Sequence, residues 1–352
     1  MSLSIDWLNQ PVPLPGVKAR RSAETRQLEL TKPPGALGRL EEVAIQLAAL
    51  QGVTRPCVDK VHIAIFAADH GIAEENVSAF PQAVTAEMVK NFSRGGAAIN
   101  VLANELGAEL EVINLGTVND TGPLKGVKNL SLGPGSANFA VQAAMTEQQL
   151  TKALEAGQRS AQRANNAGAQ LFIGGEMGIG NTTAATALAC VLLDEAPEKL
   201  TGPGTGLSTD GVAHKINVIQ AALNLHNEHI ISPLEGLRRV GGFEIAALVG
   251  AYITCAKLGL AILVDGFISS SAALTAVTIC PDIKDWFLFS HSSAEPGHRR
   301  VLDALDAKTL LDLQMRLGEG SGAAIAVPLL RMACSLHNDM ATFAEAKVLE
   351  KN

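Results

Sequence analysis

The hydrophobic residues of the chain gather in short runs, each of which ends in a polar or glycine-rich turn. The runs show no alternation of apolar and polar positions, which is typical of strands buried on both faces of a sheet. Stretches with helical spacing separate them, as in parallel sheets covered by helices on both faces. The runs span residues 61–71, 108–116, 169–178, 260–266 and 286–293, and the helical stretches span 85–106, 147–167, 181–193, 244–258 and 267–279. The pattern predicts an α/β fold with a doubly wound, mostly parallel sheet.

The two ends of the chain show helical patterns and no strand. Residues 18–51 and 323–347 have this character, and because they have no strand to join, the two ends are expected to pack together. We predict a large, Rossmann-like α/β domain over 60–310 and a small, discontinuous helical domain from 1–59 and 311–352. The large domain is expected to hold the substrate site.

Composition and charge narrow the range of partners. The chain has 352 residues, and 47% of them are hydrophobic, which is enough for a deep core. Lys and Arg number 28 against 35 Asp and Glu, so the net charge is −7. Binding to a polyanion normally requires a basic face, so nucleic acid is not an expected partner. A small anionic ligand is compatible with this charge, because N–H groups at helix ends bind phosphate.

The sequence gives no sign of export or of a membrane anchor. Its five cysteines form no CxxC pair, and most lie in apolar surroundings, as expected in a reducing compartment. Residues 1–16 contain no apolar signal region. The stretch 245–266 has the length of a membrane span, but Lys257 and Gly259 favour a helix, a turn and a buried strand. We expect a cytoplasmic protein without a membrane span.

Polar residues stand at the ends of four of the predicted strands. In open α/β sheets, ligands bind at the carboxyl ends of the strands. The residues at these ends are Asp69, His70 and Gly71; Gly174, Gly175 and Glu176; Asp265 and Gly266; and Ser290, His291 and Ser292. The predicted site is therefore at this edge of the sheet.

Two glycine-rich loops precede helices and suit a phosphate group. The first, 174–189, places Asn181 or Thr182 to cap a helix whose free N–H groups face the turn. It is neither a Walker A loop nor a regular G-x-G-x-x-G, so a tight turn with an ordinary cap is an equal alternative. The second, 201–215, has Lys215 early in its helix, where the side chain either neutralises a phosphate or stays in solvent.

Metal and serine-nucleophile chemistry find little support. No H-x-x-x-H or similar spacing accompanies Asp69 and His70, so a hydrogen-bonded structural pair is favoured over a metal site. The serines at 290–293 lack the G-x-S-x-G elbow of a serine hydrolase and better suit binding of phosphate or sugar. Asp265 is a single acid, whereas enzymes that use phosphoribosyl pyrophosphate carry two adjacent acids for the ribose and Mg²⁺. We expect neither a metal nor a cofactor.

Glu319 is the candidate general base. Gly318 and Gly320 flank it in the run RLGEGSGAA, which frees the backbone to adopt unusual φ/ψ and leaves room for a ligand. A helix expected at 308–317 and another after the motif would leave the carboxylate partly desolvated. Burial raises the pKa of a carboxyl toward the range useful to a general base. On spacing alone, a polar turn residue is the weightier alternative.

Seven motifs, taken together, point to a known family. They are TKPPGALGRLE, AADHGIAEENVSAFPQAVTAEMVKNFSRGGAAINVLA, GEMGIGNTTAATAL, VGGFEIAALVGA, LVDGFISSSAAL, FSHSSAEPGH and RLGEGSGAA. In this order they resemble the nicotinate-nucleotide–dimethylbenzimidazole phosphoribosyltransferase family over nearly the whole chain. The resemblance implies transfer of the 5-phosphoribosyl group from nicotinate mononucleotide to 5,6-dimethylbenzimidazole, for the lower-ligand nucleotide of cobalamin. It also implies a homodimer with its site close to the subunit contact.

The same resemblance implies roles for individual residues. Glu319 matches the family's catalytic glutamate, which takes a proton from the acceptor base. The phosphate is expected near Gly178, Gly180, Asn181, Thr182, Lys215, Ser292 and Ser293, and Glu176 and Asp265 are expected to face the ribose or the reacting base. The aromatic base is expected against Phe80, Pro81, Gln82, Met177 and Leu317. The acceptor range stays open, as do two rivals: a nucleosidase that activates water and a non-catalytic nucleotide-binding protein.

Overall fold

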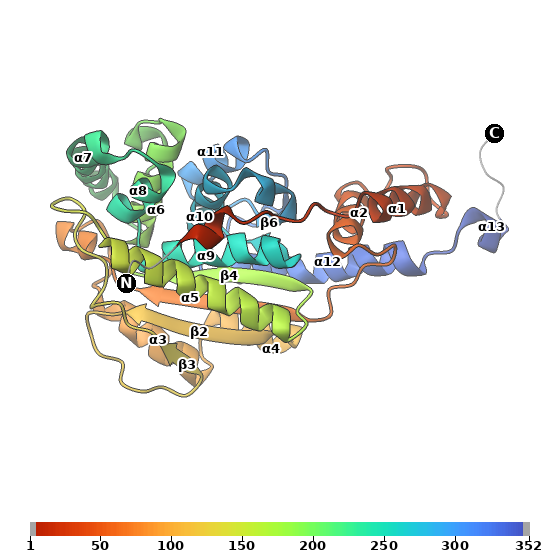
Figure 1. Cartoon of the computed structure of the whole chain (residues 1–352), viewed down its shortest axis with the longest axis horizontal. Coiled ribbons are helices and arrows are strands. Elements are labelled where there is room, and N and C mark those ends of the chain that lie inside the picture. The colour runs from red at the N-terminus through yellow and green to blue at the C-terminus, as the bar shows by residue number, and fades with distance from the viewer. Residues whose placement is uncertain (1–4, 348–352) are drawn as a thin grey trace.

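The computed structural model describes residues 5–347, and the expectations for residues 1–4 and 348–352 lie outside this range. Within it, seven strands form one parallel sheet in the order β3-β2-β1-β4-β5-β6-β7 (Figure 1). The strands are β1 (Val61–Ala68), β2 (Glu109–Gly116), β3 (Val127–Asn129), β4 (Leu171–Met177), β5 (Ala261–Val264), β6 (Phe287–His291) and β7 (Thr309–Leu311). The predicted α/β fold with a parallel sheet is confirmed.

Helices precede the first strand, connect the strands and follow the last strand. They are α1 (Val17–Glu29), α2 (Arg39–Gln51), α3 (Ala83–Arg94), α4 (Ala98–Leu106), α5 (Glu147–Asn166), α6 (Asn181–Leu193), α7 (Thr209–His226), α8 (Pro233–Val240), α9 (Phe243–Leu258), α10 (Phe267–Ile279), α11 (Pro296–Ala304), α12 (Ser321–Asp339) and α13 (Phe343–Ala346). Short 3₁₀ helices add to these, among them η2 (Gly71–Glu75) after β1. Helices α3–α11 lie in the connections between the strands, whereas α1 and α2 precede β1 and α12 and α13 follow β7.

Two neighbouring glycines of β4 show that helices cover both faces of the sheet. Successive residues of a strand point to opposite faces. The position of a side chain on Gly174 is taken by Leu248 and Tyr252 of α9, and that on Gly175 by the backbone at Glu319, just before α12. Helices α9 and α12 therefore lie on opposite faces, as the doubly wound pattern predicts.

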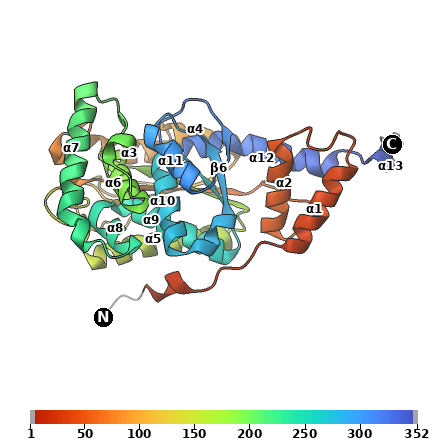
Figure 2. The same cartoon turned by 90° about the horizontal axis from the view of Figure 1, so that it is seen from above.

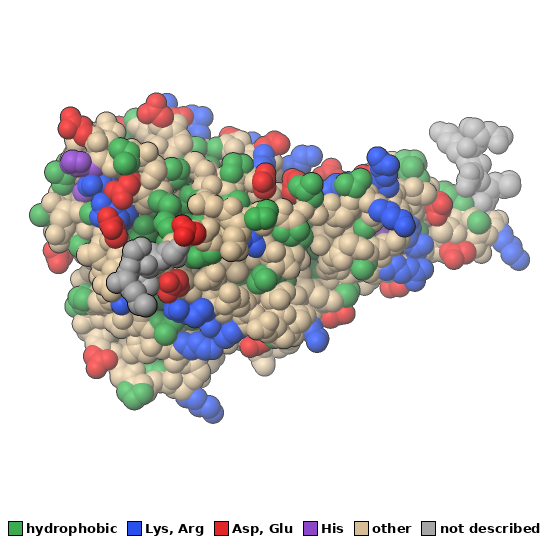
Figure 3. Space-filling model, in the orientation of Figure 1, with side chains coloured by type: hydrophobic (Ala, Val, Ile, Leu, Met, Phe, Trp, Pro, Cys, Tyr) green, Lys and Arg blue, Asp and Glu red, His purple; other side chains and the backbone are tan. Residues whose placement is uncertain are grey.

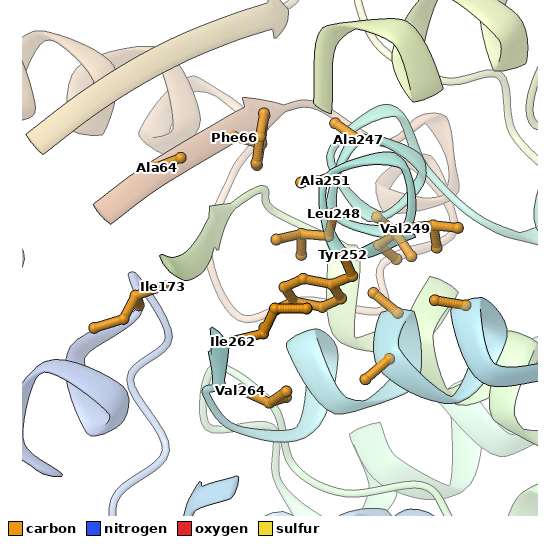
Figure 4. Packing of buried hydrophobic residues seen from close by; sticks show 14 of the residues in the cluster. Ala64, Phe66, Ile173, Ala247, Leu248, Val249, Ala251, Tyr252, Ile262 and Val264 are labelled. Atoms are coloured by element: carbon orange, nitrogen blue, oxygen red, sulfur yellow. The ribbon is translucent and has the colours of Figure 1, made fainter. Parts of the chain in front are cut away.

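The core lies on both faces of the sheet, and α9 covers one of them. Every residue of β1 and of β5 is buried, as expected for central strands of a covered parallel sheet. Figure 4 shows Leu248 and Tyr252 of α9 directed toward Ile262 and Val264 of β5. This dry interior fixes the positions of the strand ends that carry the polar residues.

The terminal helices lie to one side of the sheet. Both Figure 1 and Figure 2 show α1, α2 and the C-terminal part of α12 together at the end opposite α7 and α8. Helix α2 packs on α1 and α12, yet its buried residues Val43 and Leu47 belong to the same hydrophobic core as the sheet. The domain boundaries at 59 and 311 stay a prediction.

Two of the expected elements were wrong. The helix expected over 85–106 is two helices, because Gly95 adopts the left-handed conformation (φ 82°) and ends α3. The helix expected over 308–317 is absent. Residues Thr309–Leu311 instead pair with β6 as the edge strand β7, and residues 312–320, between β7 and α12, form no helix. This apolar run is too short to distinguish a helix from an edge strand by its pattern.

Residues 5–347 contain neither a candidate membrane-spanning helix nor a candidate metal-binding cluster. Within this range no helix combines the length and the apolar character needed to cross a bilayer. The same residues contain no cluster of three or more His, Cys, Asp or Glu side chains arranged to hold a metal ion. On the face shown in Figure 3, acidic and basic side chains both occur, with hydrophobic side chains between them.

Candidate active site

A cavity of about 320 Å³ opens at the carboxyl ends of β4, β5 and β6. The strand order reverses between β1 and β4, which is where open α/β sheets bind ligands. Predicted site residues that line it are Phe80, Glu176, Met177, Gly178, Asn181, Thr182, Asp265, Ser293, Leu317 and Glu319. Ten predicted site residues, which come from five regions of the sequence between residues 80 and 319, therefore meet in one cavity.

Glu319 lies in an unusual backbone conformation at the wall of this cavity. Residues Gly318, Glu319 and Gly320 all have positive φ (92°, 61° and 71°), and the Glu319 N–H donates to the Glu176 carbonyl over 3.2 Å. A glutamate in this region is strained and is held there by its surroundings. The two flanking glycines relieve the rest of the turn, as the sequence predicted.

The carboxyl group of Glu319 is buried but only partly hydrogen-bonded. Its Oε2 accepts the Ile99 N–H over 3.3 Å at the start of α4, and the side chain is 5% exposed. Among the described residues, nothing donates to Oε1. Desolvation raises the pKa of Glu319 above its ordinary value, Asp265 raises it further, and the Ile99 N–H opposes the shift. This environment suits a carboxylate that accepts a proton from a ligand.

Gly175 provides the space that the Glu319 backbone occupies. A Cβ on Gly175 would lie 2.6 Å from the Glu319 carbonyl carbon and 2.5 Å from Ile65 Cδ1. We expect Gly175→Ala to displace Glu319, to lower kcat at least about tenfold and to lower the free energy of unfolding by about 1–3 kcal/mol. Steady-state kinetics and urea unfolding measure both effects.

Gly174 supplies the matched control for this variant. A Cβ at Gly174 would lie 2.5 Å from Leu248 Cδ2, on the opposite face of the strand. Gly174→Ala should therefore lower stability while affecting kcat much less than Gly175→Ala. Wild-type kcat in Gly175→Ala would show that the position of Glu319 does not depend on this contact.

A second buried acid, Glu176, lies beside Glu319. The Asn181 Nδ2 amide donates a short hydrogen bond to Glu176 Oε2, and the residue is 4% exposed. Desolvation raises the pKa of Glu176 well above its ordinary value, and Asp265, Glu244 and Glu319 raise it further. This wall of the cavity is therefore rich in carboxyl groups.

The glycine-rich turn after β4 forms the floor of the cavity beside Thr182. Gly180, with φ 99°, occupies the N-cap position of α6, and no side chain caps the helix. The expected cap by Asn181 or Thr182 was wrong, because both residues already belong to the first helical turn. In the first turn of α6, the Asn181 N–H donates to the Gly178 carbonyl and the Thr183 N–H to the Gly180 carbonyl, which leaves the Thr182 N–H, among the described residues, to bind an anion.

Lys215 stands behind this turn and not on the cavity surface. Its side chain is fully buried, and Nζ donates to Thr182 Oγ1 over 2.9 Å. Desolvation lowers the pKa of Lys215 to about 8. Thr182 lines the cavity, so the Thr182 hydroxyl lies between the Lys215 ammonium group and the cavity. The cation is thus close to the predicted phosphate position.

The strand ends of β5 and β6 contribute Asp265 and His291. His291 Nε2 lies 3.6 Å from Asp265 Oδ1, and this oxygen also accepts the Ala323 N–H in the first turn of α12. Both side chains line the cavity. Ser293 lines it as well, whereas Ser292 lies outside the lining and donates its N–H to the Leu311 carbonyl.

The predicted base-binding residues divide into two groups. Phe80, Met177 and Leu317 line the cavity, and Phe80 and Leu317 are more than half exposed. Gln82 lines a separate cavity instead, and its Nε2 amide donates to the His70 carbonyl over 2.6 Å. Pro81, like Gly180, lies outside the main lining. The base-binding roles of all five predicted residues stay predictions.

Asp69 and His70 form structural contacts at the end of β1. His70 Nε2 lies 2.7 Å from Glu244 Oε1, and both side chains are fully buried. Asp69 Oδ2 accepts the Val118 N–H over 2.9 Å. Both residues therefore have structural roles, but the expected hydrogen bond between Asp69 and His70 is not among those of the described residues, because each side chain bonds to a different partner that the sequence did not indicate.

Several lining residues were missed by sequence reasoning. They are Val84, Met88, Ile179, Gly204, Thr205, Phe267, Ile268, Glu295, Arg316 and Ser321, whereas Gly266, His291 and Gly318, which also line the cavity, belong to the strand ends and the turn that the sequence indicated. Val84 and Met88 were detectable as two positions one helical turn apart. Glu295 and Arg316 were not, because the contacts that join their segments are tertiary: the Ala294 N–H donates to the Met315 carbonyl, and Arg316 donates to the Gly204 carbonyl.

Comparison with known proteins agrees with this architecture along the whole chain. A family model described as "Phosphoribosyltransferase" matches residues 12–348. The nicotinate-nucleotide–dimethylbenzimidazole phosphoribosyltransferase of Pseudomonas aeruginosa (strain UCBPP-PA14) is 59% identical over 349 residues, 99% of each chain. The protein of the same name from Xanthomonas oryzae pv. oryzae (strain PXO99A) is 58% identical over 98% of this chain and 99% of its own. The crystal structure of CobT from Thermus thermophilus matches with a TM-score of 0.91 and 44% identity, covering 95% of this chain and 100% of that chain.

The fold and the matching model define the class as a phosphoribosyltransferase. Relatives at 58–59% identity over nearly the full length make the class more specific. The chain belongs to the nicotinate-nucleotide–dimethylbenzimidazole phosphoribosyltransferase family. The resemblance carried by the seven sequence motifs is confirmed.

Proposed function

We propose that the protein transfers the 5-phosphoribosyl group from nicotinate mononucleotide to 5,6-dimethylbenzimidazole. The products are nicotinate and α-ribazole 5′-phosphate, the lower-ligand nucleotide used in cobalamin assembly. The observation that carries the proposal is the buried carboxyl of Glu319, on the wall of a cavity that is also lined by apolar side chains and by the first turn of α6. The names of the relatives support the choice of substrates.

The donor phosphate is assigned to the turn at the start of α6. The backbone N–H of Thr182 provides a donor, and Lys215 provides a positive charge through its bond to the Thr182 hydroxyl. Arg316 lines the cavity nearby. Burial raises the pKa of Glu295, whereas the positive charges of Lys215 and Arg316 lower it. The ribose then extends toward Glu176 and Asp265.

The acceptor base is assigned to the apolar part of the cavity, beside Phe80, Met177 and Leu317. The ring nitrogen that carries no proton attacks C1′ of the ribose, while the N–H at the second ring nitrogen gives its proton to Glu319. The base therefore does not accumulate positive charge. The C1′–N bond to the pyridinium ring breaks, and its electron pair neutralises the nicotinate nitrogen. Attack opposite the leaving group inverts C1′, and the leaving group needs no metal to activate it.

The carboxyl groups around the cavity favour charge development on the sugar. The bond to the pyridinium lengthens before the new bond is complete, which places positive charge on the ribosyl group. Glu319 and Asp265 lie in a cavity wall with little water, where fixed negative charge stabilises such a cation more than it does in solvent. The same field attracts the cationic pyridinium of the donor.

The proposal predicts how turnover depends on pH. Glu319 must be ionised to accept a proton, and burial raises its pKa above its ordinary value near 4.5. As the pH falls through this raised pKa, Glu319 is protonated and kcat should fall about tenfold per pH unit. The measurement is kcat at saturating substrate, since free dimethylbenzimidazole also takes up a proton in acid. An acid limb centred below pH 4.5 would contradict the raised pKa.

One incubation separates the proposal from its two rivals. The protein is mixed with nicotinate mononucleotide, with and without dimethylbenzimidazole, and the products are identified by mass. Transfer gives nicotinate and a phosphoribosyl-dimethylbenzimidazole in equal amounts, only when both substrates are present. A nucleosidase would release nicotinate and ribose 5-phosphate without the acceptor, and a non-catalytic binding protein would leave both substrates unchanged.

We further propose a cytoplasmic homodimer with a Rossmann-like domain over 60–310 and a helical domain from the two ends. The strand order 3-2-1-4-5-6 supports the Rossmann-like description. The five free cysteines support a reducing compartment. Light scattering after gel filtration tests the dimer: a mass of twice 36.7 kDa is expected, and a single-chain mass at working concentration would contradict it.

A further inference from the structure

The segment that carries Phe80 is tied to one hydroxyl group of the 201–215 loop. Thr205 Oγ1 accepts the Ala79 N–H over 3.0 Å and lies 3.1 Å from Ser78 Oγ. Ser78 Oγ in turn accepts the Phe80 N–H over 3.3 Å. Because each hydroxyl oxygen already accepts an N–H, one hydroxyl proton joins the two oxygens. A residue without a hydroxyl at position 205 would lose both links.

The segment that carries Leu317 is tied to the neighbouring residue of the same loop. Arg316 Nη1 donates to the Gly204 carbonyl over 3.1 Å. Arg316 directly precedes Leu317, and both line the cavity. Residues 204 and 205 thus connect to the segments of both apolar residues at the cavity opening, Phe80 (53% exposed) and Leu317 (60% exposed).

These links contribute more to the shape of the opening than to folding. Thr205, Ala79 and Phe80 are exposed, so water competes for their hydrogen bonds. Exposed hydrogen bonds add little net stability, but they still restrict which positions a loop occupies. The loop also touches the predicted phosphate position, since Gly204 lies against Thr182 and Lys215.

We propose that Thr205 is a positioning residue that sets where Phe80 lies relative to Leu317, and thereby selects the acceptor. The inference rests on the proposed function, in which these two side chains contact a flat bicyclic aromatic base. Thr205 itself takes no part in proton transfer. Its hydroxyl determines the width of the opening into which the base is inserted, and hence how well the site rejects bases of other widths.

The experiment compares Thr205→Val with Thr205→Ser in the full-length protein. Valine keeps the shape of the side chain and removes the hydroxyl, whereas serine keeps the hydroxyl. We expect Thr205→Val to raise KM for dimethylbenzimidazole about three- to tenfold, the effect of one or two hydrogen bonds. KM for nicotinate mononucleotide should change by less than about twofold, and Tm should change by less than about 2 °C. The preference for dimethylbenzimidazole over unsubstituted benzimidazole should narrow, and Thr205→Ser should restore it.

Two further variants make the result specific. Thr117→Val removes a surface hydroxyl that donates to the Asn119 carbonyl, away from the cavity lining, and should leave both KM values unchanged. In the double variant Ser78→Ala with Thr205→Val, the rise in KM for dimethylbenzimidazole should be smaller than the two single-variant effects combined, because each single variant already breaks the Ser78–Thr205 link. An additive loss in the double variant would contradict a shared link.

The outcomes distinguish this inference from the proposed function. Wild-type transfer with an unchanged acceptor KM in Thr205→Val overturns the inference alone. Equal losses in Thr205→Val and Thr205→Ser, or equal rises in both KM values, overturn it as well, because the hydroxyl is then not the cause. If the wild-type protein forms no phosphoribosyl-dimethylbenzimidazole at all, the proposed function and the inference are both overturned.

Discussion

Replacement of Glu319 by glutamine is expected to lower kcat by about 10²–10⁴-fold, the usual effect of losing a general base. Glutamine retains an oxygen that can accept the Ile99 N–H, so the turn and the cavity should keep their shape. Binding of nicotinate mononucleotide should stay within about threefold of wild type, since the donor contacts other walls of the cavity. Steady-state kinetics with both substrates, and calorimetric titration with the donor alone, measure the two effects.

Glu87→Gln is the control for this variant. Glu87 lies on the exposed side of α3 and pairs with Lys90 at 2.8 Å. Its loss removes one carboxylate without touching the cavity, and kcat should be unchanged. A near-normal kcat in Glu319→Gln would remove Glu319 from the mechanism.

Replacement of Lys215 by methionine is expected to raise KM for nicotinate mononucleotide by about 10- to 100-fold, with a smaller change in KM for dimethylbenzimidazole. Methionine fills a similar volume, so packing around the buried side chain is kept while the charge and the bond to Thr182 Oγ1 are lost. The pKa of Lys215, about 8, adds a second expectation. Lysine is charged below its pKa, so the wild-type KM for the donor should rise as the pH increases above about 8, and the variant should show no such rise.

Lys32→Met is the matched control for Lys215→Met. Lys32 is also buried, but it pairs with Glu41 at 2.9 Å, lies between α1 and α2, and does not line the cavity. Its replacement should lower stability, because Glu41 then loses its partner, and should leave both KM values unchanged. If Lys215→Met alters only Tm, as Lys32→Met should, the phosphate is held elsewhere.

Much of the fold was readable because its signals are local. The non-alternating apolar runs of β1, β2, β4, β5 and β6 predicted buried parallel strands, and each forms within a few residues of its expected range. The edge strand β7 was misjudged as a helix, because its short apolar run is stabilised by pairing with β6. Edge pairing is a tertiary property, and three residues carry no periodicity that would reveal it.

The candidate site was readable where residues follow strand ends. Glu176 and Asp265 stand at the ends of β4 and β5, so their convergence followed from the sheet topology. Thr205 lies in one of the two predicted loops, but Glu295 and Arg316 were not readable, since their segments meet through the Ala294 N–H and the Met315 carbonyl and through the bond from Arg316 to the Gly204 carbonyl. Neither spacing nor residue type indicates such a meeting.

At Glu319 the sequence indicated the backbone conformation but not the burial of the carboxyl group. The flanking glycines indicated a turn with unusual φ/ψ, and φ is positive at all three residues. The burial of the carboxyl group depends on α4, whose first turn supplies the Ile99 N–H. That contact joins residues 99 and 319, and the sequence around Glu319 contains nothing that points to it.

A crystal structure of the Glu319→Gln variant with both substrates bound tests the central claim most directly. The measured quantity is the distance from the residue-319 side-chain oxygen to the nearer nitrogen of dimethylbenzimidazole. The account predicts about 3 Å, a hydrogen-bond distance, with the other nitrogen facing C1′ on the side opposite the pyridinium ring. A side chain turned into solvent, or a base lying on the same side of the ribose as the pyridinium, would contradict it.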